Sequence, residues 1–227
     1  MKNKKIVCFG NSVGIRIRPN DGEGENYMDL LRKDESFFVE NFCFSGNMIG
    51  AVSRNTDKIL QKQADVIILQ YGVVELSSRS TSRRMYDYLH YKTKMTRSGK
   101  FVQTIGLFLE SKLRKPLVLL RFKRSWYHPE RFIFELNQTI SSLTKDSSAT
   151  IICLGINTPS DRVEKHLPGT KKRIAQVHAK MSAICDEFDQ SHFVGVHDLD
   201  PAFVPDGIHY NFEGHSEIHK RILEIIS

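Results

Sequence analysis

The chain has 227 residues, of which 40% are hydrophobic and 26% are charged, a composition typical of a globular protein with one sizeable core. Its formal net charge is +7. No apolar stretch is long enough to span a membrane, and the apolar run behind the basic N-terminus stops at Gly10, which is too short for a secretory signal. We therefore expect a cytoplasmic protein whose four cysteines are reduced and mostly buried.

Strand-like and helical patterns alternate along the chain. Five runs rich in β-branched, aromatic and other apolar residues predict buried strands, at about 4–9, 37–43, 65–71, 150–156 and 192–197. Helical patterns cover 47–63, 129–145, 170–188 and 212–226, and Phe134 is among the apolar side chains expected to face the core. This alternation predicts a single domain over 1–227. Its fold would be a three-layer α/β/α sandwich with a five-stranded parallel sheet and flavodoxin-like winding.

Residues 77–128 interrupt that alternation, because a crossover between parallel strands does not need so much chain. We predict a helical cap insertion above the carboxyl end of the third strand. Residues 76–131 hold 14 Lys and Arg against three acidic residues, a net charge of +11, whereas the remainder has a net charge of −4. Three interpretations stay open: a solvated helix face, a cap that attracts an anionic substrate, and a contact with an anionic membrane surface or another subunit. No nucleic-acid-binding motif accompanies the charge, so no nucleic-acid partner is expected.

Two short motifs at opposite ends of the chain carry the candidate chemistry. Ser12 follows the first predicted strand between Gly10 and Gly14, and Asp206 precedes His209 by three residues just before the last helix. Parallel α/β sheets gather such segments at the carboxyl ends of their strands. Ser12 would then be a nucleophile, His209 its base and Asp206 the group that orients the base. The simpler alternatives are that Ser12 caps a helix or lines a phosphate-binding loop, and that Asp206 is a turn residue.

Four blocks in this order resemble the SGNH/GDSL hydrolase superfamily. Residues 9–12 resemble its Gly-Asp-Ser block, with Asn11 in place of Asp, and residues 206–209 with Gly214 and His215 resemble its last block. Residues 41–47 resemble the second block, whose glycine, here Gly46, supplies a backbone N–H to the oxyanion hole. Residues 66–75 resemble the third, usually Gly-x-Asn-Asp. The resemblance implies a serine esterase or a related acyltransferase that needs no cofactor.

The third block departs from that pattern, because Val74 stands where the family has an oxyanion-hole asparagine. The resemblance leaves the backbone N–H groups of Ser12 and Gly46 as donors, and Asn47 or Asn11 as candidate substitutes for the missing amide. The residues that we expect to bind substrate come from the first block, the third block and the start of the insertion: Asn11, Gly72, Val74, Glu75, Arg83 and Arg84.

The resemblance, more than any single residue, suggests an ester substrate that is an O-acylated carbohydrate or glycoconjugate, since small bacterial members of the superfamily act on such esters. For a cap that attracts an anionic substrate, the candidates are a nucleotide sugar, a lipid-pyrophosphate glycan, an acidic glycan and a coenzyme A thioester. An O-acyltransferase in glycan biosynthesis and a non-catalytic glycan-binding module are the alternatives. His215 and His219 stand four residues apart, but no third ligand accompanies them, so no metal site is expected.

Overall fold

The computed structural model describes residues 3–19, 24–89 and 97–227, and residues 90–96 of the predicted insertion lie outside this part of the chain. Its centre is a five-stranded sheet in which every neighbouring pair is parallel and the strand order is β2-β1-β3-β4-β5. This is the flavodoxin-like order that the alternating pattern predicts. The strands are β1 (Lys4–Gly10), β2 (Phe37–Cys43), β3 (Val66–Gln70), β4 (Thr150–Leu154) and β5 (Ser191–Val194).

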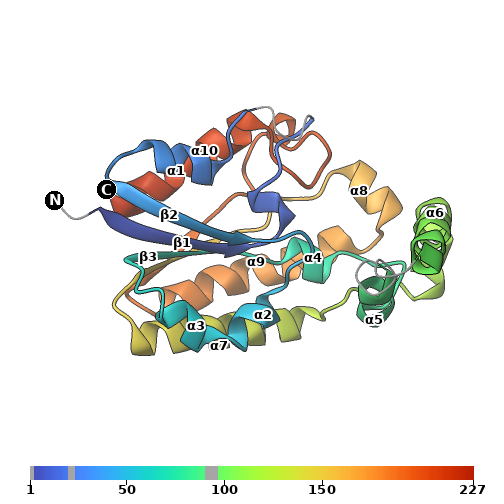
Figure 1. The fold of residues 1–227 in the computed structure, drawn as a ribbon, viewed down its shortest axis with the longest axis horizontal. Coiled ribbons are helices and arrows are strands. Elements are labelled where there is room, and N and C mark those ends of the chain that lie inside the picture. Colours follow the sequence, from blue (N-terminus) through green and yellow to red (C-terminus); the bar gives the residue numbers. More distant parts are fainter. Residues whose placement is uncertain (1–2, 20–23, 90–96) are drawn as a thin grey trace.

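Helices cover both faces of the sheet, as Figure 1 shows. One face carries α1 (Tyr27–Lys33) and α10 (Phe212–Ile226). The other carries α2 (Ile49–Ser53), α3 (Thr56–Leu60), α7 (Pro129–Asp146) and α9 (Thr170–Asp186). The shorter elements near the carboxyl ends of the strands are η1 (Ser12–Gly14), α4 (Val73–Leu76), α8 (Asp161–His166) and η4 (Pro201–Phe203). The three-layer prediction is therefore confirmed.

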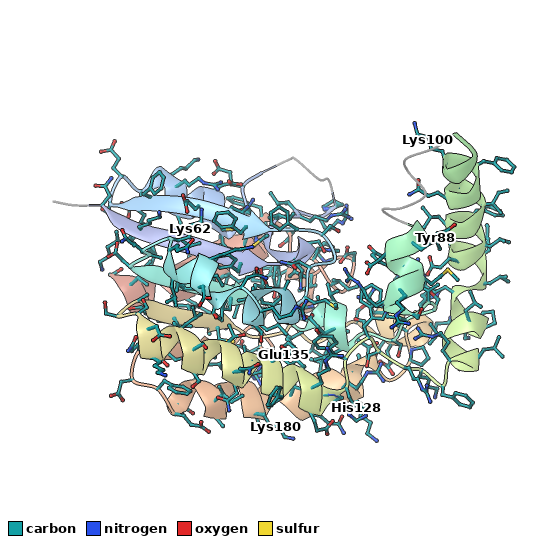
Figure 2. The ribbon with its side chains drawn as sticks, turned by 60° about the horizontal axis from the view of Figure 1, so that its bottom comes forward. Lys62, Tyr88, Lys100, His128, Glu135 and Lys180 are labelled. Carbon is teal, nitrogen blue, oxygen red and sulfur yellow. The ribbon has the colours of Figure 1, made fainter. Side chains whose placement is uncertain are left out.

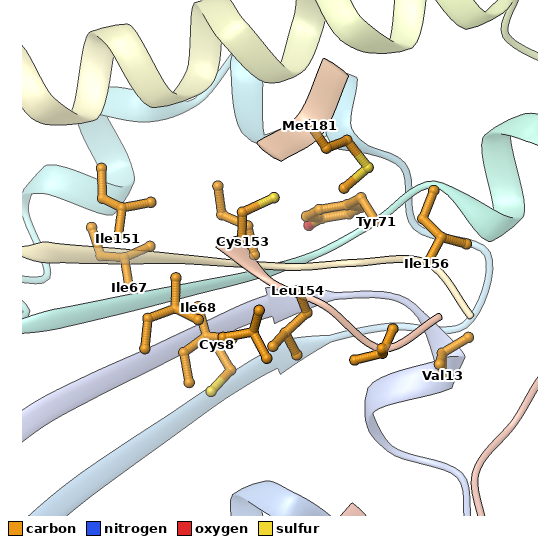
Figure 3. Close-up of a cluster of buried hydrophobic side chains, with 14 of the residues drawn as sticks. Cys8, Val13, Ile67, Ile68, Tyr71, Ile151, Cys153, Leu154, Ile156 and Met181 are labelled. Carbon is orange, nitrogen blue, oxygen red and sulfur yellow. The ribbon is translucent and has the colours of Figure 1, made fainter. Parts of the chain in front are cut away.

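The core is made by side chains that leave the sheet alternately toward its two helical layers. In Figure 3, Ile67 and Cys153 point toward the layer of α7 and α9, whereas Ile68 and Leu154 point to the opposite side. All four are at most 2% exposed. Strands buried on both faces become near-continuous apolar runs, which is why the sequence reveals them so clearly.

Two details of the predicted core are wrong. The expected helix over 47–63 is divided into α2 and α3, and the Asn55 side chain between them donates a hydrogen bond to the Ala51 carbonyl at 2.8 Å. Phe134 is 63% exposed, because it lies two positions from the buried Phe132 and therefore on another face of α7. All four cysteines are buried and free, as expected.

The described part of the insertion contains α5 (Arg83–Asp87) and α6 (Arg97–Leu120), which lie beyond the carboxyl ends of the strands. An isolated bridge between Ser78 and Ser125 joins the two ends of the excursion. Figure 2 shows α6 standing to one side of the sheet and its covering helices. No helix in the described ranges is both long and apolar enough to cross a membrane.

Candidate active site

The turn after β1 holds Ser12 at the carboxyl edge of the sheet. Asn11 is buried and caps the short helix η1, because its Oδ1 accepts a hydrogen bond from the Val13 backbone N–H at 3.1 Å. Its Nδ2 is buried and has no hydrogen-bond partner among the described residues. Asn11 thus shapes the turn that presents the neighbouring Ser12 hydroxyl.

The turn before α10 holds His209 and its carboxylate partner. Asp206 Oδ1 accepts hydrogen bonds from the backbone N–H groups of Ile208 at 2.8 Å and His209 at 2.7 Å. Gly207 between them has a φ of +81°, and a Cβ there would lie 2.1 Å from Ser160 Oγ. Only glycine fits this tight, left-handed turn against the loop before α8.

These two turns bring the three predicted catalytic side chains together. Ser12 Oγ lies 3.0 Å from His209 Nε2, across a sequence separation of 197 residues. On the other side of the ring, His209 Nδ1 donates to Asp206 Oδ2 at 2.8 Å. The arrangement has the connectivity of a nucleophile, a base and an orienting carboxylate.

The Asp206 carboxylate remains ionised over the physiological pH range. Partial burial raises the pKa of the Asp206 carboxyl group. The hydrogen bonds from the His209 ring and from two backbone N–H groups lower the pKa by more, so it lies well below its usual value. Arg18 Nε adds a contact of 3.1 Å to Oδ2. A fixed negative charge therefore faces His209 Nδ1, which favours the tautomer whose Nε2 can accept the Ser12 proton.

The loop after β2 places Gly46 and Asn47 near the Ser12 turn. Gly46 has a φ of +74° and lines the same cavity as Ser12 and His209. The Asn47 amide is already engaged, because its Nδ2 donates to the Gly10 carbonyl at 3.3 Å and to Tyr71 Oη at 3.2 Å. Its two amide hydrogens hold the loop onto Gly10 of β1 and onto Tyr71, which follows β3. The Asn47 amide therefore has no free N–H for the oxyanion role that the sequence suggested.

Some residues of the third sequence block line the Ser12 cavity, and others are buried in the protein interior. Val74 lines the cavity with an apolar side chain, and Gly72 begins α4 with a φ of +119°. Glu75 is fully buried, and its two carboxylate oxygens accept from the Ile49 N–H at 2.7 Å and the Gly72 N–H at 3.0 Å. Burial raises the Glu75 pKa to about 7 despite those bonds. Glu75 thus joins α2 to the β3–α4 turn and does not reach the cavity where substrate would bind.

Arg79 and Trp126 belong to the site although the sequence analysis missed both. They line the Ser12 cavity together with Tyr86. The Arg79 guanidinium lies over the Trp126 ring at 4.2 Å, and its Nη2 donates to the Val74 carbonyl at 2.6 Å. Burial lowers the Arg79 pKa to about 10, so the group stays charged at neutral pH. Among the described residues, no carboxylate forms an ion pair with Arg79.

Two adjoining cavities form one groove that runs from Ser12 toward α6. The cavity at Ser12 has a volume of about 150 Å³, and the next, of about 230 Å³, reaches Leu107, Glu110 and Arg114 on α6. The residues that line both cavities are Arg79, Tyr86, Trp126, Leu167 and Ile208.

The two arginines that the sequence analysis expected to bind substrate lie differently. The Arg83 Nη1 donates to the Gly46 carbonyl at 2.9 Å, and its Nε pairs with Asp87 at 2.9 Å. Arg83 therefore positions the Gly46 loop from outside the cavity. Arg84 is exposed and lines neither cavity of the groove.

The last block also contains His215, whose buried side chain connects two segments of the backbone. His215 is fully buried, its Nε2 donates to the Arg16 carbonyl at 3.0 Å, and burial lowers its pKa to about 4. It therefore links α10 to the segment that follows Ser12. In residues 3–19, 24–89 and 97–227, no group of three or more His, Cys, Asp or Glu side chains could hold a metal ion.

The fold is that of known ester hydrolases. No protein-family model matches the sequence, and no curated protein matches it. Among solved structures, Axe2, an acetylxylan esterase from Geobacillus stearothermophilus, is similar with a TM-score of 0.62 and 14% identity over 100% of this chain and 95% of that chain. LAE5, an alpha/beta hydrolase from the metagenome of Lake Arreo, Spain, has a TM-score of 0.61 and 15% identity over 99% of this chain and 95% of its own.

Solved catalytic mutants of Axe2 replace a serine, an aspartate and a histidine with alanine. In that protein the aspartate precedes the histidine by three residues. At these identities the likeness establishes the fold, and it agrees with the resemblance of the four sequence blocks to the SGNH/GDSL superfamily.

Proposed function

We propose that this protein is a serine-dependent carboxylic ester hydrolase of the SGNH/GDSL type that removes an acyl group, with acetyl as the first candidate, from an oxygen of a carbohydrate or glycoconjugate. The observation that carries the proposal is the chain of contacts from Ser12 through His209 to Asp206, with distances of 3.0 Å and 2.8 Å. The shared fold and the aspartate–histidine spacing of the Axe2 catalytic mutants support the same chemistry and the acetylated carbohydrate.

The mechanism uses the histidine twice. Ser12 Oγ attacks the ester carbonyl while His209 Nε2 takes the hydroxyl proton, and Asp206 stabilises the imidazolium that forms. The tetrahedral intermediate then breaks its bond to the leaving alcohol, which receives the proton from His209. A water molecule attacks the resulting acyl-serine, again losing its proton to His209, and the acid leaves as Ser12 regains its proton. If a sugar hydroxyl replaces water in that step, the same site is an O-acyltransferase.

The oxyanion would be stabilised by the backbone N–H groups of Ser12 and Gly46. Val74 offers no third donor, and the loss of one donor typically costs about 100- to 1000-fold in turnover. Arg79 provides a compensating feature, because its positive charge lies on the wall of the same cavity and forms no ion pair with a carboxylate of the described residues. A positively charged guanidinium on the wall of a groove also favours a substrate that carries a negative charge.

The decisive experiment is labelling with a fluorophosphonate, which reacts with an activated serine whatever the natural substrate is. The wild type should be labelled and should hydrolyse a short-chain nitrophenyl ester, and Ser12→Ala should do neither. Equal activity of wild type and Ser12→Ala would refute the assignment of the nucleophile.

A non-catalytic glycan-binding module is the second candidate, and Val74 in the oxyanion position is the observation that favours it. Such a module would keep the same polar pocket. It would bind an acetylated oligosaccharide and resist the fluorophosphonate.

A further inference from the structure

The outer face of α6 carries several large apolar side chains that are exposed to solvent. Phe101 is 68% exposed, Phe108 60% and Leu120 74%. Exposed apolar residues recur along α6 mostly at intervals of three and four residues, so their side chains form one stripe along the helix. The full set of exposed apolar residues on α6 is Phe101, Ile105, Phe108, Leu109, Leu113, Leu119 and Leu120. A contiguous apolar surface of this kind marks an interaction site rather than ordinary surface variation.

The opposite side of α6 already has its packing partners. Gly106 lies so close to Leu89 that an added Cβ would approach its Cδ2 to 2.9 Å, and Val118 is fully buried. Glu110 accepts a hydrogen bond from the Ser80 hydroxyl. The helix is thus attached to the protein by one face, and its outer apolar face is directed away from the sheet (Figure 2).

The charge of α6 and the turn behind it determines which partner fits that face. Residues 97–124 contain eight Lys and Arg against one acidic residue, a net charge of +7. Lys112 and Lys115 are exposed at the apolar stripe itself. A helix with Phe and Leu on one side and cations around them is typical of segments that lie in the interface of an anionic membrane. Two copies pressed together through this face would instead bring two strongly positive segments into contact.

We propose that the outer face of α6 is a docking surface for an anionic phospholipid bilayer. The apolar side chains would enter the boundary between headgroups and acyl chains while the lysines and arginines contact the phosphates. With 24 residues, α6 spans about 36 Å along the surface. It would lie on the membrane without crossing it, since no helix in the described ranges could span a bilayer. Docking depends only on this surface and requires no catalysis.

Docking also fixes where the groove would open. The cavity that continues from Ser12 is walled by Leu107 and Arg114 of the same helix. A docked protein would therefore hold the groove about one helix diameter from the bilayer, which is about 10 Å. If the proposed ester hydrolysis holds, this placement favours a glycan ester carried on a lipid over the same ester free in solution.

The test is flotation of the full chain with vesicles of phosphatidylcholine alone or mixed with phosphatidylglycerol. We expect binding to the mixed vesicles only, decreasing as salt is added. The double variant F101S/F108S should lose about tenfold or more of the binding, and K112Q/K115Q should lose a similar amount and show a weaker dependence on salt. Phe134→Ser is the matched control, because Phe134 on α7 is 63% exposed and Phe108 is 60% exposed.

Each outcome decides the proposal. The proposal would be overturned if F101S/F108S bound the mixed vesicles as well as the wild type does. It would also be overturned if Phe134→Ser lost as much binding as F101S/F108S. The absence of binding to anionic vesicles would overturn it as well. A wild-type dimer that F101S/F108S converts to a monomer, with no vesicle binding, would assign the face to self-association instead. Ser12→Ala should float like the wild type, so failure of the ester chemistry and failure of docking are distinguishable. Unfolding temperatures near that of the wild type show that the variants are folded.

Discussion

The contact between Asp206 and His209 allows a sharp test of the proposed chemistry through Asp206→Asn. The amide oxygen can still accept from the backbone N–H groups of Ile208 and His209, as Oδ1 does at 2.8 Å and 2.7 Å. The new NH2 group would then face His209 Nδ1, where a carboxylate oxygen now lies at 2.8 Å. Two donors cannot share that contact, so the imidazole must carry its proton on Nε2.

That change of tautomer disables the base while leaving the turn intact. His209 Nε2 lies 3.0 Å from Ser12 Oγ, and a proton already on that nitrogen prevents it from accepting another. The same substitution in a serine protease lowers kcat about 10,000-fold, which corresponds to about 5.5 kcal/mol of barrier. We expect a loss of that order here, because the carboxylate makes the same contact with the ring.

The assay is the steady-state hydrolysis of a nitrophenyl acetate together with the rate of fluorophosphonate labelling, after circular dichroism has shown a native fold. Arg18→Gln is the control, since Arg18 Nε contacts the same carboxylate oxygen at 3.1 Å from a partly exposed position. Its removal leaves the tautomer unchanged and should cost less than about tenfold. An Asp206→Asn enzyme within tenfold of the wild type would refute the role assigned to the carboxylate.

Two further predictions concern the third block. Val74→Asn should raise ester hydrolysis about 100-fold if only an oxyanion donor is missing, whereas no gain would favour the binding module or Arg79 as the replacement. Glu75→Gln tests the buried carboxyl, whose pKa of about 7 exceeds its usual 4.5. Between those values the folded protein keeps a proton that the unfolded chain has lost, so Glu75 should lower the unfolding free energy as pH rises, by on the order of 3 kcal/mol. Denaturant titrations at several pH values give the unfolding free energies of the wild type and of Glu75→Gln, and the pH dependence of their difference isolates the contribution of Glu75. A difference that does not change with pH would contradict the prediction.

The sheet and the candidate triad could be predicted because both leave short local signals. Strands buried on two faces are apolar throughout, and the turns that hold Ser12 and His209 require glycines at fixed positions. The sequence also contains a helix-start signal for α1. Asn26 and Asp29 form a capping box at its start, and that spacing is visible in the sequence.

The remaining parts of the site depend on contacts that no local pattern encodes. Arg79 and Trp126 lie at opposite ends of the insertion and meet only because that segment folds back on itself. Glu75 has an ionisable side chain and is the last residue of the third block, and both facts favoured a substrate-binding role. Its burial against the Ile49 and Gly72 backbone follows from the packing of α2 over the sheet.

The division of the triad between the two ends of the chain has a consequence for biosynthesis. Ser12 is synthesised 197 positions before His209, its proposed base. If the proposed chemistry holds, a growing chain that does not yet contain His209 carries a serine without its proton acceptor and does not attack esters. Chains that end before His209 would not react, so a reactive-serine probe would count only folded molecules that contain both residues.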